Sequence, residues 1–121
     1  MQRLSENVRL LGNGYFNYYV VGQTEAVVIE CGMSAGVAIF SRQWAKMGDK
    51  PRVKSILALH SHFDHVCGIP MLKALFPDTR VLASAAAQKV LTLDKVLTAL
   101  SKADDVVSEA YFRAGLVAEK P

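Results

Sequence analysis

The first thirty residues contain three short apolar runs, and turn residues separate them. The runs cover residues 8–11, 15–21 and 26–31. Between the first two stands Asn13-Gly14, a pair that favours a tight hairpin because both residues tolerate positive φ. The pattern therefore predicts a meander of strands at the start of the chain.

The apolar residues then change to a helical period. Ser34 is the expected N-cap, and Gly48 stands where a C-terminal cap belongs. Between them the apolar positions recur every three or four residues, at Val37, Phe40, Trp44 and Met47. We expect a helix between these two caps.

A largely buried strand is predicted over residues 53–59, and it leads directly into His60. The next helix should begin at Ile69, with Pro70 in its first turn, and end at Pro77. After it the pattern predicts a strand over residues 80–82, a helix capped by Ser84 that runs to Leu91, and a helical stretch over residues 93–115 with a candidate break at Asp104-Asp105. Strands that alternate with helices predict an α/β fold in which helices pack on a sheet.

The composition narrows the class of protein. The chain has 121 residues, 51% of them apolar, so we expect one domain with a buried core and not a disordered chain. No apolar run reaches the roughly 18 residues of a membrane span, and no apolar signal segment follows the charged start. A cytoplasmic protein without a membrane partner is therefore expected.

Charge and cysteine content exclude two further classes. The net charge is +3, but the 14 Lys and Arg residues are scattered along the chain, which argues against a nucleic-acid partner. The two cysteines, Cys31 and Cys67, are too few for a disulfide framework. We expect both to be free thiols.

All three histidines fall in the segment 60–65, which reads His-Ser-His-Phe-Asp-His. A shuffled chain of this composition would contain that pattern with a probability on the order of 2 in 100,000. Imidazole nitrogens and carboxylate oxygens suit Zn²⁺, Fe²⁺ and similar ions, so the pattern favours a metal site over a local hydrogen-bonded cluster.

The spacing of the segment is compatible with two ions. Side chains two apart on an extended chain point the same way about 6.6 to 7 Å apart, so His60 and His62 can converge on one ion. Asp64 and His65 lie past the strand end, where a turning backbone can aim them at a second ion. Ligand sites of α/β sheets lie at the carboxyl ends of strands, as this segment does.

Residues 60–65 resemble the HxHxDH signature of the metallo-β-lactamase fold superfamily. Three flanking pieces resemble the same family, namely residues 17–21, 28–32 and 68–70. The resemblance covers about residues 8 to 91. It implies a four-layer αββα sandwich, of which residues 1–121 supply the N-terminal half, one sheet with flanking helices. Residues 93–115 then resemble the variable helical insertion that covers the active site in many members.

The resemblance also implies a chemistry. His60 and His62 would bind the first metal, and Asp64 and His65 the second. The cofactor would be zinc, as one or two ions, with iron or manganese as alternatives. A metal-bound hydroxide, oriented by Asp64 as the catalytic residue, would attack an ester, thioester or lactone carbonyl of a small molecule.

The chain departs from the family pattern at three places. Glu30 stands where the family usually has Asp. The family's Asp makes hydrogen bonds to the metal ligands, and the sequence leaves open whether Glu30 makes them here. Cys67 replaces a common Gly, and is either a small buried hydrophobe or a redox-sensitive thiol. No His follows His65, and the later aspartates occupy apparent turn or helix positions: Asp78, Asp94, Asp104 and Asp105.

The remaining ligands should therefore come from downstream sequence or a second chain, and the isolated chain should be inactive. Such a chain could also form homo-oligomers. Tyr111 and Phe112, in the helical stretch, either contact substrate or simply pack.

Three other functions remain open. An iron-dependent oxidoreductase of the same fold, such as a sulfur dioxygenase, uses the same kind of ligands. A noncatalytic binding or assembly domain could retain the fold with a degenerate metal site. A nucleic-acid-processing member is the least favoured, because the basic residues do not cluster.

Overall fold

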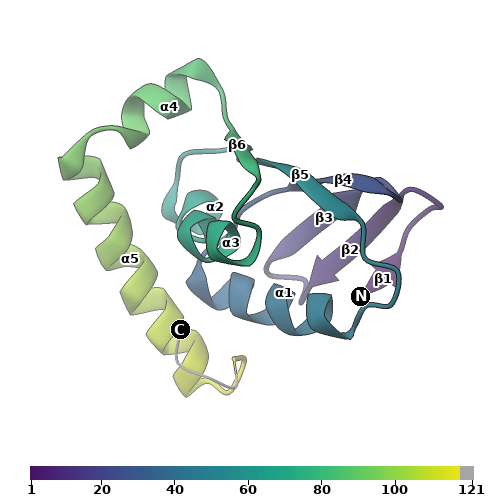
Figure 1. Ribbon diagram of the computed structural model, residues 1–121. Helices are drawn as coiled ribbons and strands as arrows, with labels where there is room; N and C mark the ends of the chain where they lie inside the picture. Colours follow the sequence, from purple (N-terminus) through teal and green to yellow (C-terminus); the bar gives the residue numbers. More distant parts are fainter. Residues whose placement is uncertain (118–121) are drawn as a thin grey trace.

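The computed structural model describes residues 1–117, which form a six-stranded sheet flanked by helices (Figure 1). The strands are β1 (Gln2–Arg3), β2 (Val8–Gly12), β3 (Asn17–Val21), β4 (Glu25–Ile29), β5 (Arg52–Leu57) and β6 (Arg80–Leu82). The helices are α1 (Ser34–Lys46), α2 (Phe63–Val66), α3 (Ile69–Leu75), α4 (Ala85–Leu91) and α5 (Asp94–Arg113).

The strands lie in the order β1-β2-β3-β4-β5-β6 and form a mixed sheet. The pairs from β1 to β4 are antiparallel, which confirms the predicted meander. β4, β5 and β6 run parallel, with α1 between the first two and α2 and α3 between the last two. The predicted α/β fold, one sheet with flanking helices, is confirmed.

One face of the sheet packs against helices. Its side chains include Tyr18, Val28 and Ile56, which are fully buried. The ring of Phe40, on α1, lies 5.1 Å from that of Tyr18, and the Trp44 ring lies 5.0 Å from that of Phe76 at the end of α3. The apolar stripe of α1 is thus the centre of the core, as the helical period predicts.

The opposite face carries a row of apolar side chains, and no helix covers it among residues 1–117 (Figure 1). Strand register places five apolar side chains in one row across it: Leu10, Tyr19, Ile29, Leu57 and Leu82. Tyr19 and Leu82 are 37% and 40% exposed. A row of this kind is what a sheet needs in order to pack against a second layer.

The N-terminus of α1 is capped differently from the prediction. Ser34 is the first helical residue, Met33 is the N-cap, and no side chain of the helix itself caps it. Instead the Ser34 N–H donates to Asp104 Oδ1 at 2.9 Å, the Ser34 hydroxyl donates to Asp104 Oδ2, and the Ala35 N–H donates to Ser108 Oγ at 3.3 Å. Helix α5 therefore supplies the acceptors that the first turn of α1 needs.

Two further local predictions are wrong for related reasons. α5 is continuous through Asp104-Asp105, because Asp104 is buried against α1 and does not end its own helix. Gly48 is not the C-cap of α1; Met47 is, and Gly48 has no positive φ. The Lys50 ammonium donates to the Met47 carbonyl at 2.7 Å, so a cation satisfies this helix end.

The other boundaries agree with the predictions within a few residues. β3 begins at Asn17 and not at residue 15, and β5 ends at Leu57, two residues early. Pro70 lies in the first turn of α3, and Ser84 caps α4 by accepting from the Ala87 N–H at 3.1 Å.

No helix within residues 1–117 is long and apolar enough to cross a membrane.

We predict that Asp104→Ala destabilises the protein by about 1–3 kcal/mol, because it leaves the N–H and the hydroxyl of Ser34, at the start of α1, without their acceptors. Asp105→Ala is the matched control, since its side chain is exposed beside Asp104. Urea unfolding of the full-length protein measures both. Equal stability of the two variants would show that the cap contributes nothing.

Candidate functional site

The candidate site lies where β4 and β5 end. These strands are parallel, with Ile29 opposite Leu57, so their carboxyl ends meet at one edge of the sheet. The Glu30 N–H continues the pairing by donating to the Leu57 carbonyl at 2.9 Å. The residue after β4 is thereby held beside the segment that leads to His60.

Glu30 has an unusual backbone. Its φ of +86° is the only positive value at a non-glycine residue in the described part of the chain. This conformation costs about 1–2 kcal/mol at a residue with a Cβ. Both carboxylate oxygens have partners, because Oε1 accepts from the Cys31 N–H at 3.1 Å and Oε2 lies 2.9 Å from His65 Nδ1. These contacts offset the cost and fix the side chain.

The loop after Glu30 packs against the junction of α2 and α3. The Gly68 N–H donates to the Gly32 carbonyl at 3.1 Å, and a Cβ at Gly68 would lie 2.0 Å from the Cys31 carbonyl oxygen. The Tyr18 hydroxyl donates to the same Cys31 carbonyl at 3.3 Å. Burial raises the pKa of the Tyr18 hydroxyl, so it stays protonated as this donor. The close approach at Gly68 brings His65 next to Glu30.

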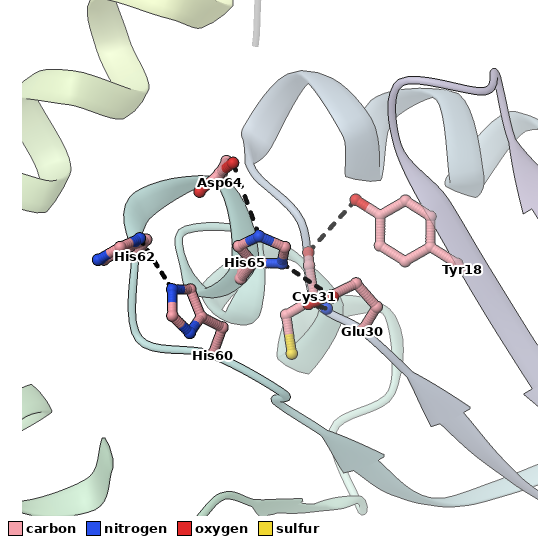
Figure 2. Close-up of polar contacts among 7 residues, drawn as sticks. All are labelled: Tyr18, Glu30, Cys31, His60, His62, Asp64 and His65. Atoms are coloured by element: carbon pink, nitrogen blue, oxygen red, sulfur yellow. Dashed lines mark hydrogen bonds and ion pairs between the residues drawn. The ribbon is translucent and has the colours of Figure 1, made fainter. Parts of the chain in front are cut away.

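The structure gathers the four residues of the motif in one place (Figure 2). His60 Nε2 and His62 Nδ1 lie 2.8 Å apart, and the His60 and His65 ring centres lie 5.2 Å apart. Asp64 Oδ2 lies 3.6 Å from His65 Nε2. His60 and His62 are exposed, whereas Asp64 and His65 are half-buried.

The hydrogen bonds determine which nitrogen atoms are free. A carboxylate only accepts, so His65 Nδ1 must donate to Glu30, and in the neutral ring the lone pair then lies on Nε2, on the side of Asp64. His60 and His62 are bonded to each other, so each directs one ring nitrogen at its neighbour. In this conformation, no group of three His, Cys, Asp or Glu side chains within residues 1–117 is placed to hold a metal ion.

The donor set nevertheless fits a metal in its chemistry. Three imidazoles and a carboxylate are gathered at one edge, and a carboxylate fixes the tautomer of one imidazole. His60 and His62 are exposed, so rotation of their side chains would separate the two rings. The assignment of these four residues as ligands remains a prediction.

A cavity of about 270 Å³ adjoins the cluster. It is lined by Tyr15, Phe16, Asn17, Tyr19, Glu30, Gly32, Leu59, Asp64 and His65. Tyr15, Tyr19 and Leu59 line it but are not among the site residues predicted from the sequence. The alternation along β3 is the signal that separates exposed Tyr19 from buried Tyr18, because neighbours on a strand face opposite sides.

Tyr111 packs and does not line this cavity. Its ring lies 5.1 Å from that of Phe16 and 6.2 Å from that of Tyr15, both in the loop between β2 and β3. Phe112 is half-buried and is also absent from the lining within the described residues. Packing is therefore the role of Tyr111, and α5 touches the aromatic loop beside the site.

Both cysteines are free thiols, as predicted. Burial raises the pKa of the Cys67 thiol to about 11, with smaller contributions from Asp104, Asp105 and Asp64. The Cys67 thiol donates to the Leu100 carbonyl, with 3.4 Å between sulfur and oxygen. Burial and the charge of Glu30 raise the pKa of Cys31 to about 12. These shifts favour the small buried hydrophobe over the redox-sensitive thiol.

Comparison with known proteins gives three findings. The family model described as metallo-beta-lactamase superfamily matches residues 11–117. A hydroxyacylglutathione hydrolase from Stenotrophomonas maltophilia is 43% identical over 58 residues, which are 48% of this chain and 20% of that protein. A HARLDQ motif mutant of a metallo-beta-lactamase from Cronobacter sakazakii superposes with a TM-score of 0.63 at 26% sequence identity. The superposed region is 72% of this chain and 36% of that protein's chain. The chain thus spans well under two thirds of either relative.

The raised thiol pKa predicts slow alkylation of Cys67. At pH 8 its thiolate fraction, and so its rate with iodoacetamide, should be on the order of 10²-fold lower than that of N-acetylcysteine. Peptide mass spectrometry over a time course measures the rate, and the urea-unfolded protein is the control. A native Cys67 that reacts as fast as N-acetylcysteine would contradict this electrostatic picture.

Proposed function

Because the chain belongs to the metallo-beta-lactamase superfamily, we propose that it is part of a metal-dependent hydrolase that cleaves an ester, thioester or lactone of a small molecule. The observation that carries the proposal is the gathering of His60, His62, Asp64 and His65 at one sheet edge, beside a cavity. The match to a hydroxyacylglutathione hydrolase supports hydrolysis as the class of reaction.

In this proposal His60 and His62 bind a first ion, and Asp64 and His65 bind a second. Zinc is the expected metal, and iron or manganese are compatible with the same nitrogen and oxygen donors. A bound ion would polarise the substrate carbonyl and lower the pKa of water. Glu30 accepts from the Nδ1–H of His65, which fixes the ring orientation and leaves Nε2 as the nitrogen that would bind the ion.

Asp64 is the proposed catalytic residue. Its carboxylate is 47% exposed and lies 3.6 Å from His65 Nε2, too far for a strong hydrogen bond, so it can accept one from a water molecule. That contact would orient the water toward a substrate held in the cavity. The aromatic side chains Tyr15 and Tyr19 would supply the apolar wall against which the substrate lies.

The site also requires parts of the fold outside this chain. We propose that downstream sequence or a second chain supplies the remaining ligands and a second layer over the apolar row from Leu10 to Leu82. The 36% coverage of the solved relative supports this. The isolated chain is then inactive, and residues 93–115 are the insertion that covers the completed site. A cytoplasmic location remains part of the same proposal.

The metal assignment predicts a loss of bound metal in histidine variants. In the full-length protein, His60→Ala and His65→Ala should each lower metal affinity and kcat/KM by about 10²-fold or more, because each removes a ligand. Metal analysis after dialysis and thioester hydrolysis rates measure these losses. Asp78→Asn, in an exposed turn away from the cluster, is the control. Unchanged metal content in both histidine variants would refute the site.

The role of Glu30 can be tested separately. Glu30→Gln keeps the shape of the side chain but removes the negative charge beside His65 Nδ1. Metal affinity should therefore fall about 10- to 100-fold while the fold is retained. Glu25→Gln, at the exposed start of β4, the strand that Glu30 follows, is the matched control. Competition with a chromophoric chelator measures both affinities. If both variants bind metal equally, the contact between Glu30 and His65 has no part in binding.

A further inference from the structure

A second cavity, of about 350 Å³, lies beneath α5. It is lined by Ser34, Val66, Cys67, Ile69, Pro70, Met71, Leu91, Leu97, Leu100, Ser101 and Asp104. Figure 1 shows α5 standing beside α2 and α3, the helices that supply the opposite wall. Helix α2 contributes to both cavities, because Asp64 and His65 line the first and Val66 lines the second.

The wall formed by α5 changes character along its length. Leu97, Leu100, Ser101 and Asp104 are spaced at i, i+3, i+4 and i+7, so they share one helical face. The first two are apolar and the last two are polar. The cavity therefore has an apolar part and one polar end, where Asp104 accepts hydrogen bonds from Ser34.

The apolar part is incompletely filled. Leu97 is 45% exposed, and Leu100, Ile69 and Met71 are only half-buried although they lie next to the core. A cavity of this size accommodates a small organic molecule. Covering these side chains would gain about 25 cal/mol for each Å² of apolar surface removed from water.

The polar end is negative. Asp104 is 7% exposed, and among residues 1–117 no Lys or Arg side chain lines this cavity. Each Asp104 oxygen accepts one hydrogen bond from Ser34, and a carboxylate has about four acceptor positions, so further donors can bind there. The cavity thus offers an apolar wall and a buried carboxylate, a combination complementary to a ligand with an apolar body and a cationic head.

We propose that this cavity binds a small amphiphilic amine, with its hydrocarbon chain against Leu97 and Leu100 and its ammonium group at Asp104. The site is separate from the histidine cluster, and the proposal does not depend on the hydrolysis proposed above. A charge-assisted hydrogen bond to a buried carboxylate accounts for the preference for an ammonium group.

The test is calorimetric titration of the full-length protein with octylammonium and with octanoate, below their micelle concentrations. Octylammonium should bind at least about tenfold more tightly than octanoate. Asp104→Asn, which still accepts from the Ser34 N–H, should abolish that preference. Asp105→Asn, the exposed neighbour, should retain it.

Ser101→Trp tests the location without touching the cap of α1. Ser101 is exposed and lines the cavity, so the large side chain should fill the space and abolish binding of octylammonium in a folded protein. Circular dichroism confirms folding of each variant. The proposal is overturned if octylammonium does not bind, if octanoate binds equally well, or if Ser101→Trp leaves binding unchanged.

Discussion

Strands β4 and β5 run parallel with Ile29 opposite Leu57, and the contacts of the histidine cluster depend on that register. The pairing continues one residue further through the Glu30 N–H, so Glu30 is fixed where the chain leaves the sheet. A shift of β5 by one residue would turn its side chains to the other face and separate Glu30 from His65. The site is therefore a consequence of sheet register, assisted by the glycine at position 68 that lets α2 and α3 approach the loop after β4.

Two polar contacts hold the elements around this edge in place, and each requires an unfavourable feature: a strained backbone at Glu30 and a buried carboxylate at Asp104. Glu30 holds a left-handed backbone, and its carboxylate joins the loop after β4 to His65 on α2. Asp104 buries a carboxylate, and its acceptors join α5 to the first turn of α1. Buried or strained polar groups persist when the surrounding contacts satisfy them. Each contact joins elements that lie far apart in the sequence. The contact of Glu30 lies beside the cavity at the histidine cluster, and the contact of Asp104 lies beside the cavity under α5.

Local patterns predicted most of the elements, because period and turn residues act within a few positions of the chain. The same patterns do not predict features that depend on contacts between residues far apart in the sequence. The local pattern predicts that Ser34 is an N-cap, but its hydrogen-bond partner is Asp104, 70 residues away, and that contact also explains why α5 does not break there. Spacing indicated that the histidines would gather, and they do. It could not indicate that His60 and His62 would bond to each other or that Glu30 would fix the tautomer of His65, because both depend on side-chain orientation in the folded protein.

The histidine cluster at the end of β5 is the metal site that we propose. Anomalous X-ray diffraction at the zinc edge, from crystals of the zinc-loaded full-length protein, tests it most directly. We expect an anomalous peak about 2.0–2.1 Å from a ring nitrogen of both His60 and His62, with their mutual hydrogen bond broken. A crystal grown at saturating zinc in which the two rings remain hydrogen-bonded to each other, with no peak at the cluster, would contradict the metal assignment.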